Sequence, residues 1–260
     1  MDIHTTKLFV HIPYRILLNN LDKLAELGIN VEIYIDGEGL DTYTDKEIDL
    51  INSFFAKYGL RKILHGPIYD LNPGSLDSHI RAISQERIRQ TVFLCEKLNS
   101  DQIVFHHGFH HAYYRNHREK WLENSFIIWK PIVEYCLPKN INLAIENSFD
   151  PGPSIILELI EKINFSNFGA CFDIGHFNAF GEKSPLEIFE EYPQEIIKEI
   201  HLSDNLGDFD THLALGKGNI NFREFLKLIE EKGIDPIITL EPHSLEDVKL
   251  CFEYLTNLKY

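Results

Sequence analysis

The chain has 260 residues, and its 25 Lys and Arg against 40 Asp and Glu give a formal net charge of −15. Its apolar content of 44% and charged content of 25% are typical of a globular protein and exclude disordered and collagen-like chains. The negative charge argues against non-specific binding of nucleic acid, which depends on Lys and Arg at the phosphates.

Short apolar runs alternate with segments of helical period along the whole chain. The predicted strands are residues 7–11, 31–35, 62–65, 102–106, 142–146, 169–173, 199–202 and 237–241. The predicted helices are residues 16–27, 45–57, 79–98, 118–136 (which includes Pro131), 154–162, 186–190, 222–232 and 245–258. Eight strand–helix units favour an α/β fold, a single (β/α)8 TIM barrel, with residues 1–260 as one domain.

An open, doubly wound sheet is the alternative architecture for such an alternation. It is disfavoured because no G-x-G-x-x-G motif follows the first strand. The segment Gly216-Lys217-Gly218 has the spacing of neither a dinucleotide fingerprint nor a P-loop.

Cysteine usage and the N-terminal sequence predict a cytoplasmic, reduced protein. Cys95, Cys136, Cys171 and Cys251 are scattered and form no C-x-x-C pair, so neither a disulfide framework nor a zinc knot is expected. Residues 1–7 lack the pattern of a signal peptide, and no apolar run approaches the ~20 residues that span a bilayer. The sequence predicts no membrane association and does not specify an oligomeric state.

Six predicted strands end on residue types that bind metal ions, and in a TIM barrel all these ends meet at one mouth, where the chemistry occurs. One such residue would be ordinary, but six at equivalent positions indicate a shared site. These residues are His65, His106, Glu146, Asp173, His201 and Glu241.

Three further candidates lie close by in the sequence. His176 follows Asp173 in a predicted loop, and Asp210 and His212 face one way if their segment is extended. His with carboxylates suits Zn²⁺, Mn²⁺ or Fe²⁺. Because these residues are too many for one ion, we expect up to three ions that share carboxylates.

Together these motifs resemble the xylose-isomerase-like TIM-barrel superfamily, which includes endonuclease IV (AP endonuclease family 2) and sugar phosphate isomerase/epimerase-like proteins. The resemblance to endonuclease IV implies three metal sites: His65, His106 and Glu146; Glu146, Asp173, His201 and Glu241; and His176, Asp210 and His212. The segments that carry it are His65-Gly66-Pro67, residues 104–108 (VFHHG), 144–147 (AIEN), 172–176 (FDIGH), 200–204 (IHLSD), 210–212 (DTH), 215–220 (LGKGNI) and Leu240-Glu241.

The departures from endonuclease IV concern the contacts to DNA. The loop expected after the second strand, residues 37–43, contains no basic residue, and Tyr69 is displaced by one residue from an aromatic that the family inserts into DNA. Lys217 stands where the family usually has Glu, and His107 stands where it usually has Pro. Neither position is a metal ligand. We therefore expect a small phosphorylated or sugar-like substrate in preference to duplex DNA.

Two enzymatic functions and one binding function follow from this site. The preferred one is hydrolysis of a phosphoester by a multinuclear site, because three divalent ions outweigh four carboxylates and would attract phosphate. The alternative is isomerisation or epimerisation of a sugar or sugar phosphate, with one ion and Glu146 and Glu241 as the acid–base pair. That alternative leaves His65, His106, Asp210 and His212 without a task and lacks an Arg that the ketose epimerases carry after the seventh strand. A metal-dependent sugar-binding barrel without turnover is the third class.

Residues 110–118 (HHAYYRNHR) form the one basic, aromatic cluster at the predicted mouth. The hypothesis is that Arg115 and Arg118 in this cluster contact a substrate phosphate. The alternative is a solvated loop that leads into the next helix.

Overall fold

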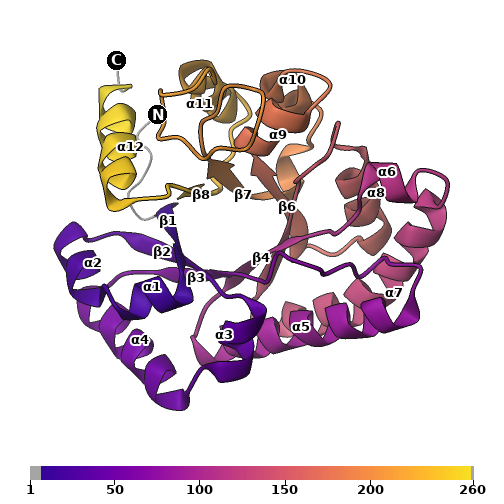
Figure 1. Cartoon of the computed structure of the whole chain (residues 1–260), viewed down its shortest axis with the longest axis horizontal. Coiled ribbons are helices and arrows are strands. Elements are labelled where there is room, and N and C mark those ends of the chain that lie inside the picture. Colours follow the sequence, from indigo (N-terminus) through magenta and orange to yellow (C-terminus); the bar gives the residue numbers. More distant parts are fainter. Residues whose placement is uncertain (1–6, 259–260) are drawn as a thin grey trace.

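Eight parallel strands form a closed barrel in which each strand pairs with the next along the chain and β8 pairs with β1. The structure, a computed structural model, describes residues 7–258. Figure 1 shows the ring of strands with the helices around its outside, so the predicted TIM barrel is confirmed. The strands are β1 (Leu8–Pro13), β2 (Asn30–Tyr34), β3 (Lys62–His65), β4 (Gln102–His106), β5 (Asn142–Glu146), β6 (Phe168–Asp173), β7 (Ile197–Leu202) and β8 (Ile237–Leu240).

Most of the predicted helices are present within one or two residues of their expected bounds, and the helix around Pro131 has the predicted ends. The helices are α1 (Tyr14–Leu18), α2 (Leu21–Leu27), α3 (Gly37–Thr42), α4 (Asp45–Tyr58), α5 (Ser78–Lys97), α6 (His111–Tyr114), α7 (Arg118–Cys136), α8 (Ser154–Ile163), α9 (Ile174–Phe180), α10 (Pro185–Glu190), α11 (Phe222–Glu231) and α12 (Leu245–Asn257). Two 3-10 turns, η2 (Leu137–Lys139) and η3 (Gln194–Ile196), precede β5 and β7.

The single helix predicted for residues 16–27 was wrong, because the chain breaks between α1 and α2. Asn20 has a non-helical backbone (φ −134°, ψ 19°) and precedes the first residue of α2. The side chains of Asn19 and Asn20 donate hydrogen bonds to the carbonyls of Arg15 and Ile16. Asn side chains compete in this way for backbone groups that a continuous helix would use.

Three short helices, α3, α6 and α9, lie in stretches that the sequence indicated as loops. α9 matters most for function, because Asp173 caps its first turn by accepting a hydrogen bond from the backbone N–H of His176 at 2.6 Å. His176 therefore lies on a helix that begins at the end of β6, which fixes it beside Asp173.

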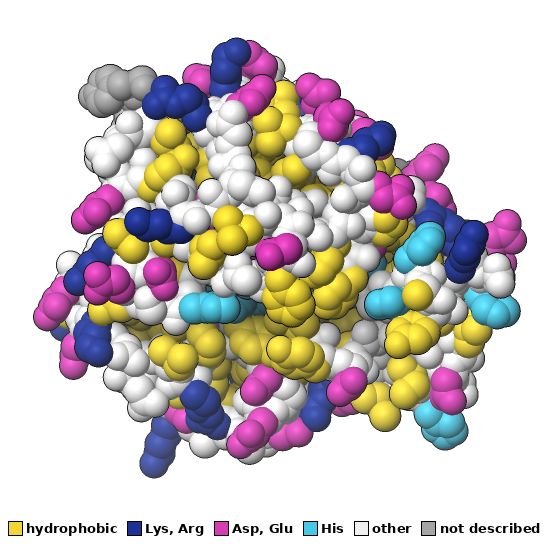
Figure 2. Space-filling view, turned by 45° about the horizontal axis from the view of Figure 1, so that its top comes forward, with side chains coloured by type: hydrophobic (Ala, Val, Ile, Leu, Met, Phe, Trp, Pro, Cys, Tyr) yellow, Lys and Arg dark blue, Asp and Glu magenta, His cyan; other side chains and the backbone are white. Residues whose placement is uncertain are grey.

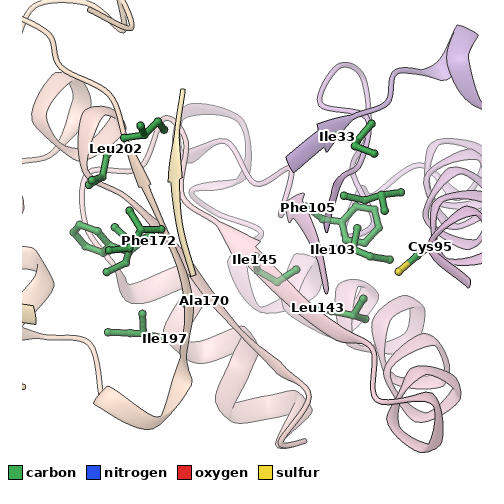
Figure 3. Packing of buried hydrophobic residues seen from close by; sticks show 14 of the residues in the cluster. Ile33, Cys95, Ile103, Phe105, Leu143, Ile145, Ala170, Phe172, Ile197 and Leu202 are labelled. Atoms are coloured by element: carbon green, nitrogen blue, oxygen red, sulfur yellow. The ribbon is translucent and has the colours of Figure 1, made fainter. Parts of the chain in front are cut away.

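Side chains of each strand alternate between the helices and the barrel interior. Ile103 and Phe105 of β4 pack toward the helices with Leu143 and Ile145 of β5, as Figure 3 shows. Val104 between them belongs to a separate buried cluster with Ala144 and Cys171. The same alternation turns His106 and Glu146, two residues beyond Val104 and Ala144, toward the inside of the mouth.

Within the described residues, no helix is long and apolar enough to cross a lipid bilayer. The four cysteines are free and buried. The expected lack of a signal peptide concerns mainly residues 1–6, which lie outside the described residues.

Candidate metal centre

The nine predicted ligand residues come together in three clusters, and within each cluster the ligand atoms lie within 4.8 Å of one another. These are the three groups that the resemblance to endonuclease IV implies, and Glu146 belongs to two of them. Clusters of His, Asp and Glu with this spacing fit divalent metal sites. The first cluster is His65, His106 and Glu146; the second is Glu146, Asp173, His201 and Glu241; the third is His176, Asp210 and His212.

The register of the barrel places the residues of the first two clusters side by side. His106 at the end of β4 pairs with Glu146 at the end of β5, and Asp173 of β6 pairs with His201 of β7. Glu241 directly follows β8, and its backbone N–H donates to the carbonyl of Leu202 at 3.2 Å. Neighbouring parallel strands thus present their last inward side chains at one level.

In the first cluster, the two histidines approach the same carboxylate oxygen. Oε2 of Glu146 lies 2.9 Å from Nε2 of His65 and 2.9 Å from Nε2 of His106. Nδ1 of His65 donates to the carbonyl of Gly66 at 2.8 Å, which turns its Nε2 toward Glu146. This arrangement is typical of a ligating histidine whose other nitrogen is held by a backbone carbonyl.

In the second cluster, a fully buried histidine lies between carboxylates. Nδ1 of His201 is 3.2 Å from Oε1 of Glu146 and 3.2 Å from Oε1 of Glu241. Oδ2 of Asp173 lies 4.0 Å from the same nitrogen. Asn147 holds Asp173 in place by accepting from its backbone N–H and donating to its carbonyl, each at 2.9 Å.

The third cluster joins α9 to the long loop after β7. Oδ2 of Asp210 lies 2.9 Å from Nε2 of His212 and 3.3 Å from Nε2 of His176. The expected reason for this proximity was wrong, because the segment is not extended at His212, whose φ is +48°. Nδ1 of His176 donates to the carbonyl of Asn147 at 2.7 Å, so this histidine is also fixed through the nitrogen that faces away from Asp210.

The second and third clusters contain buried carboxylate oxygens without a partner, which shows whether these residues fit a cation. Three buried oxygens have no hydrogen-bond partner: Oδ2 of Asp173, Oδ1 of Asp210 and Oε2 of Glu241. Burial of such an oxygen without a partner is costly. A divalent ion would satisfy them, and carboxylates with imidazole nitrogens are its usual ligands, so the residues fit such an ion.

The electrostatics of the clusters support the same conclusion. Burial alone lowers the pKa of His65 and His212, but the hydrogen bonds and charges of nearby carboxylates raise each pKa to about 9. Burial and the neighbouring carboxylates Glu241 and Glu146 raise the pKa of Asp173 to about 8, although His176 opposes them. The carboxylates therefore attract cations, either protons or metal ions, into this mouth.

The sequence did not indicate two buried acids, Glu32 and Glu199, that lie in the barrel interior behind His201. Oε2 of Glu32 accepts from Nε2 of His201 at 3.1 Å, and its Oε1 lies 2.8 Å from Nδ1 of His11. Glu199 accepts from Gln102 and Thr239 at 2.5 Å each. A charged residue in the middle of an apolar strand, as in the sequence VEIYI, is the signal that could have identified Glu32.

The mouth opens into a cavity of about 900 Å³. Seven of the nine candidate ligands line it, and Asp173 and His201 lie outside its lining. Figure 2 shows hydrophobic side chains around a hollow in which histidine is visible. Aromatic side chains on the cavity wall include Tyr34, Tyr69, Tyr113, Phe149, Phe180 and Phe209.

The cluster at residues 110–118 contributes rings to this cavity, not arginines. His110, Tyr113 and Tyr114 line it, whereas Arg115 and Arg118 do not. Arg118 instead forms an ion pair with Glu158 of α8 at 2.6 Å. The structure therefore gives no support to the hypothesis that these arginines contact a substrate phosphate.

The chain was compared with known proteins. Residues 21–256 match the family model described as xylose isomerase-like TIM barrel. The uncharacterized protein MJ1311 of Methanocaldococcus jannaschii is 32% identical over 92% of this chain and 83% of its own length. A probable endonuclease 4 of Sulfurihydrogenibium sp. is 25% identical over 70% of this chain and 71% of its own length. The crystal structure of a D-tagatose 3-epimerase-like protein has 30% identity and a TM-score of 0.84, over 97% of this chain and 96% of that one.

Proposed function

Because the chain belongs to the xylose isomerase-like TIM-barrel family, we propose that it is a divalent-metal-dependent sugar epimerase or isomerase. The observation that carries this proposal is the pair Glu146 and Glu241, which both line the cavity and both lie 3.2 Å from one nitrogen of His201. The likeness to a D-tagatose 3-epimerase-like protein supports a sugar as the substrate.

The second cluster would hold the ion through Glu146, Asp173, His201 and Glu241. A divalent ion bound there would orient substrate oxygens and stabilise negative charge on them. The chain itself provides the orientation of these ligands, because Asn147 fixes Asp173 and Glu32 fixes His201.

Glu146 and Glu241 would move the proton. One carboxylate accepts a proton from the carbon next to the carbonyl, and the released electron pair forms the carbon–carbon double bond of an enediolate. The other carboxylic acid returns a proton to the opposite face of the same carbon in an epimerisation. In an isomerisation it protonates the former carbonyl carbon, while the hydroxyl proton on the neighbouring carbon passes to the former carbonyl oxygen. Two carboxyl groups that both lie close to one imidazole nitrogen are placed for this exchange, in which one group gains a proton and the other loses one.

This proposal reverses the preference for phosphoester hydrolysis that was inferred from the sequence. The D-tagatose 3-epimerase-like relative is more similar to this chain, at 30% identity, than the probable endonuclease 4, at 25%. In addition, the arginines expected to contact phosphate do not line the cavity.

The proposal is tested by incubating the Mn²⁺-loaded protein with a panel of ketohexoses and aldohexoses and separating the products by chromatography. Conversion of one sugar into an isomer, with loss of conversion in Glu146→Gln, is the expected result. No conversion of any sugar, together with release of phosphate from phosphoesters, would contradict it.

Phosphoester hydrolysis is the second candidate, and the first and third clusters favour it. An epimerase with one ion gives His65, His106, Asp210 and His212 no catalytic task, yet these residues are gathered with ligand spacing. Metal analysis of the native protein separates the two functions. Near three ions per chain with phosphate release supports hydrolysis, whereas one ion with sugar interconversion supports the first proposal. Metal-dependent sugar binding without either reaction would identify a binding protein.

A further inference from the structure

Four rings form a continuous wall on one side of the cavity, which we call the aromatic wall: His110, Tyr113, Phe149 and Phe180. The ring centroids of His110 and Tyr113 are 4.6 Å apart, those of His110 and Phe149 are 6.3 Å apart, and those of Phe149 and Phe180 are 4.8 Å apart. The wall joins the segment after β4 with its short helix α6, the loop after β5 and the end of α9.

Two of the four rings of the aromatic wall are open to solvent, and the other two, His110 and Phe180, are half-buried. Tyr113 is 77% exposed and Phe149 is 62% exposed. Contiguous exposed aromatic side chains beside a concave site mark a surface that binds something apolar or ring-shaped. Flat ring faces stack against other rings, and such contacts do not require charge.

The wall has a fixed position relative to the candidate metal ligands. α9 begins directly after Asp173 and ends at Phe180, and a helix of this length rises about 10 Å. A ligand whose reactive end lies on the second cluster would therefore need a further ring beyond that end to reach the wall. At about 900 Å³, the cavity has room for more than one sugar ring.

In the described part of the chain, the basic side chains that line this cavity are histidines. Among the residues that the structure describes, no Lys or Arg lines it. Arg15 pairs with Glu47, Arg87 with Asp41 and Arg118 with Glu158. Arg115, which directly follows α6, is exposed and lies outside the cavity lining. Phosphate recognition away from a metal ion usually relies on Arg or Lys, and among the described residues neither lines the cavity at the wall.

We propose that the substrate is an uncharged sugar that carries a second uncharged ring at the end remote from its carbonyl, and that this ring stacks on the aromatic wall. The inference rests on the proposed sugar epimerase or isomerase function and names its substrate class. It excludes sugar phosphates as the preferred substrate.

Binding to the Mn²⁺-loaded protein tests the inference without requiring turnover. Isothermal titration would compare D-fructose, D-fructose 6-phosphate, 6-O-α-D-glucosyl-D-fructose and 6-O-benzyl-D-fructose. We expect at least one of the two extended neutral sugars to bind about tenfold or more tightly than D-fructose, because one stacked ring contributes on this scale. Whichever of these two extended sugars binds more tightly then identifies the second ring as a sugar or an aryl group. Tightest binding of the 6-phosphate, or equal binding of all four, would overturn the inference.

Substitutions in the aromatic wall distinguish the loss of ring stacking from a general loss of sugar binding. Phe149→Ala and Tyr113→Ala should each weaken the extended sugar by about tenfold and leave D-fructose binding unchanged. Phe93→Ala, which removes an exposed ring of α5 outside this cavity, is the matched control and should change neither. Equal weakening of both sugars by the wall variants would contradict the inference. If the extended sugar binds as expected but no sugar is converted, the proposed function fails, whereas the stacking of a second ring on the aromatic wall stands.

Discussion

The buried carboxylate of Glu32 accepts a hydrogen bond from Nε2 of His201 at 3.1 Å, on the side of the ring opposite the candidate metal cluster. Nδ1 of His201 therefore carries the free electron pair toward Glu146 and Glu241 when Nε2 holds the proton. Such a partner orients a ligating histidine and fixes its tautomer.

Replacement of Glu32 should weaken metal binding at the second cluster, although Glu32 is not one of the four ligand candidates of that cluster. We expect Glu32→Gln to lower the affinity for Mn²⁺ or Zn²⁺ by about 10- to 100-fold, measured by competition with a chromophoric chelator. Glu199→Gln is the matched comparison, because Oε1 of Glu199 lies farther from the same nitrogen of His201, at 3.5 Å, and burial and the charge of Glu32 raise the pKa of Glu199 to about 8. Equal losses of affinity in the two variants would argue against a specific role of Glu32.

The metal-free protein should lose stability as the pH rises from 4.5, the ordinary pKa of a Glu carboxyl group, to above 8. The pKa of Glu199 rises from 4.5 to about 8 in the folded state, so the folded chain binds a proton that the unfolded chain has lost in this window. The free energy of unfolding therefore falls with increasing pH. Urea denaturation of the chelator-treated protein at pH 5, 6, 7 and 8 measures this slope. Glu199→Gln should have a smaller slope, and an unchanged slope would show that Glu199 does not titrate in this range.

Divalent ions should stabilise the fold, because the clusters are assembled only in the folded chain. At a free ion concentration of about 100 times the dissociation constant, binding adds about 2.7 kcal/mol to the free energy of unfolding. Thermal denaturation with and without a chelator checks this, and Asp173→Asn should reduce the gain because Oδ2 of Asp173 has no other partner. A melting temperature that does not respond to Mn²⁺, Zn²⁺ or Fe²⁺ would contradict a metal site.

His107 and Asp150 should contribute to stability and not to metal binding. Nε2 of His107 donates to Oδ2 of Asp150 at 2.8 Å, and the same oxygen accepts from the backbone N–H of Ser148. Asp150→Ala leaves both buried donors without their acceptor and should lower the free energy of unfolding by about 1–3 kcal/mol for each donor. Asp150→Asn retains one acceptor oxygen and should cost less. A loss of metal affinity greater than that of Glu32→Gln would mean that this pair acts on the metal site.

The barrel and the convergence of its strand ends could be predicted from the sequence. The alternation of apolar runs with segments of helical period, and the order of strands and helices, are local signals. His106 and Glu146, for example, end their strands at equivalent positions, and parallel pairing then brings them into register. The contact between Glu32 and His201 could not be predicted in this way, because it joins β2 to β7 across the closed barrel. Likewise, the break at Asn20 and the short helix α9 depend on side-chain capping, which competes with the apolar period that indicated one helix or a loop.

The most direct test of the central claim is proton exchange at the carbon next to the carbonyl. The Mn²⁺-loaded protein would be incubated in D₂O with the sugar that binds most tightly, the metal removed with a chelator, and deuterium incorporation followed by NMR. We expect deuterium at that single carbon with wild-type protein and little or none with Glu146→Gln or Glu241→Gln, although both variants remain folded. Conversion of the sugar without deuterium incorporation, or full incorporation by either variant, would contradict the assignment of Glu146 and Glu241 as the proton-transfer pair.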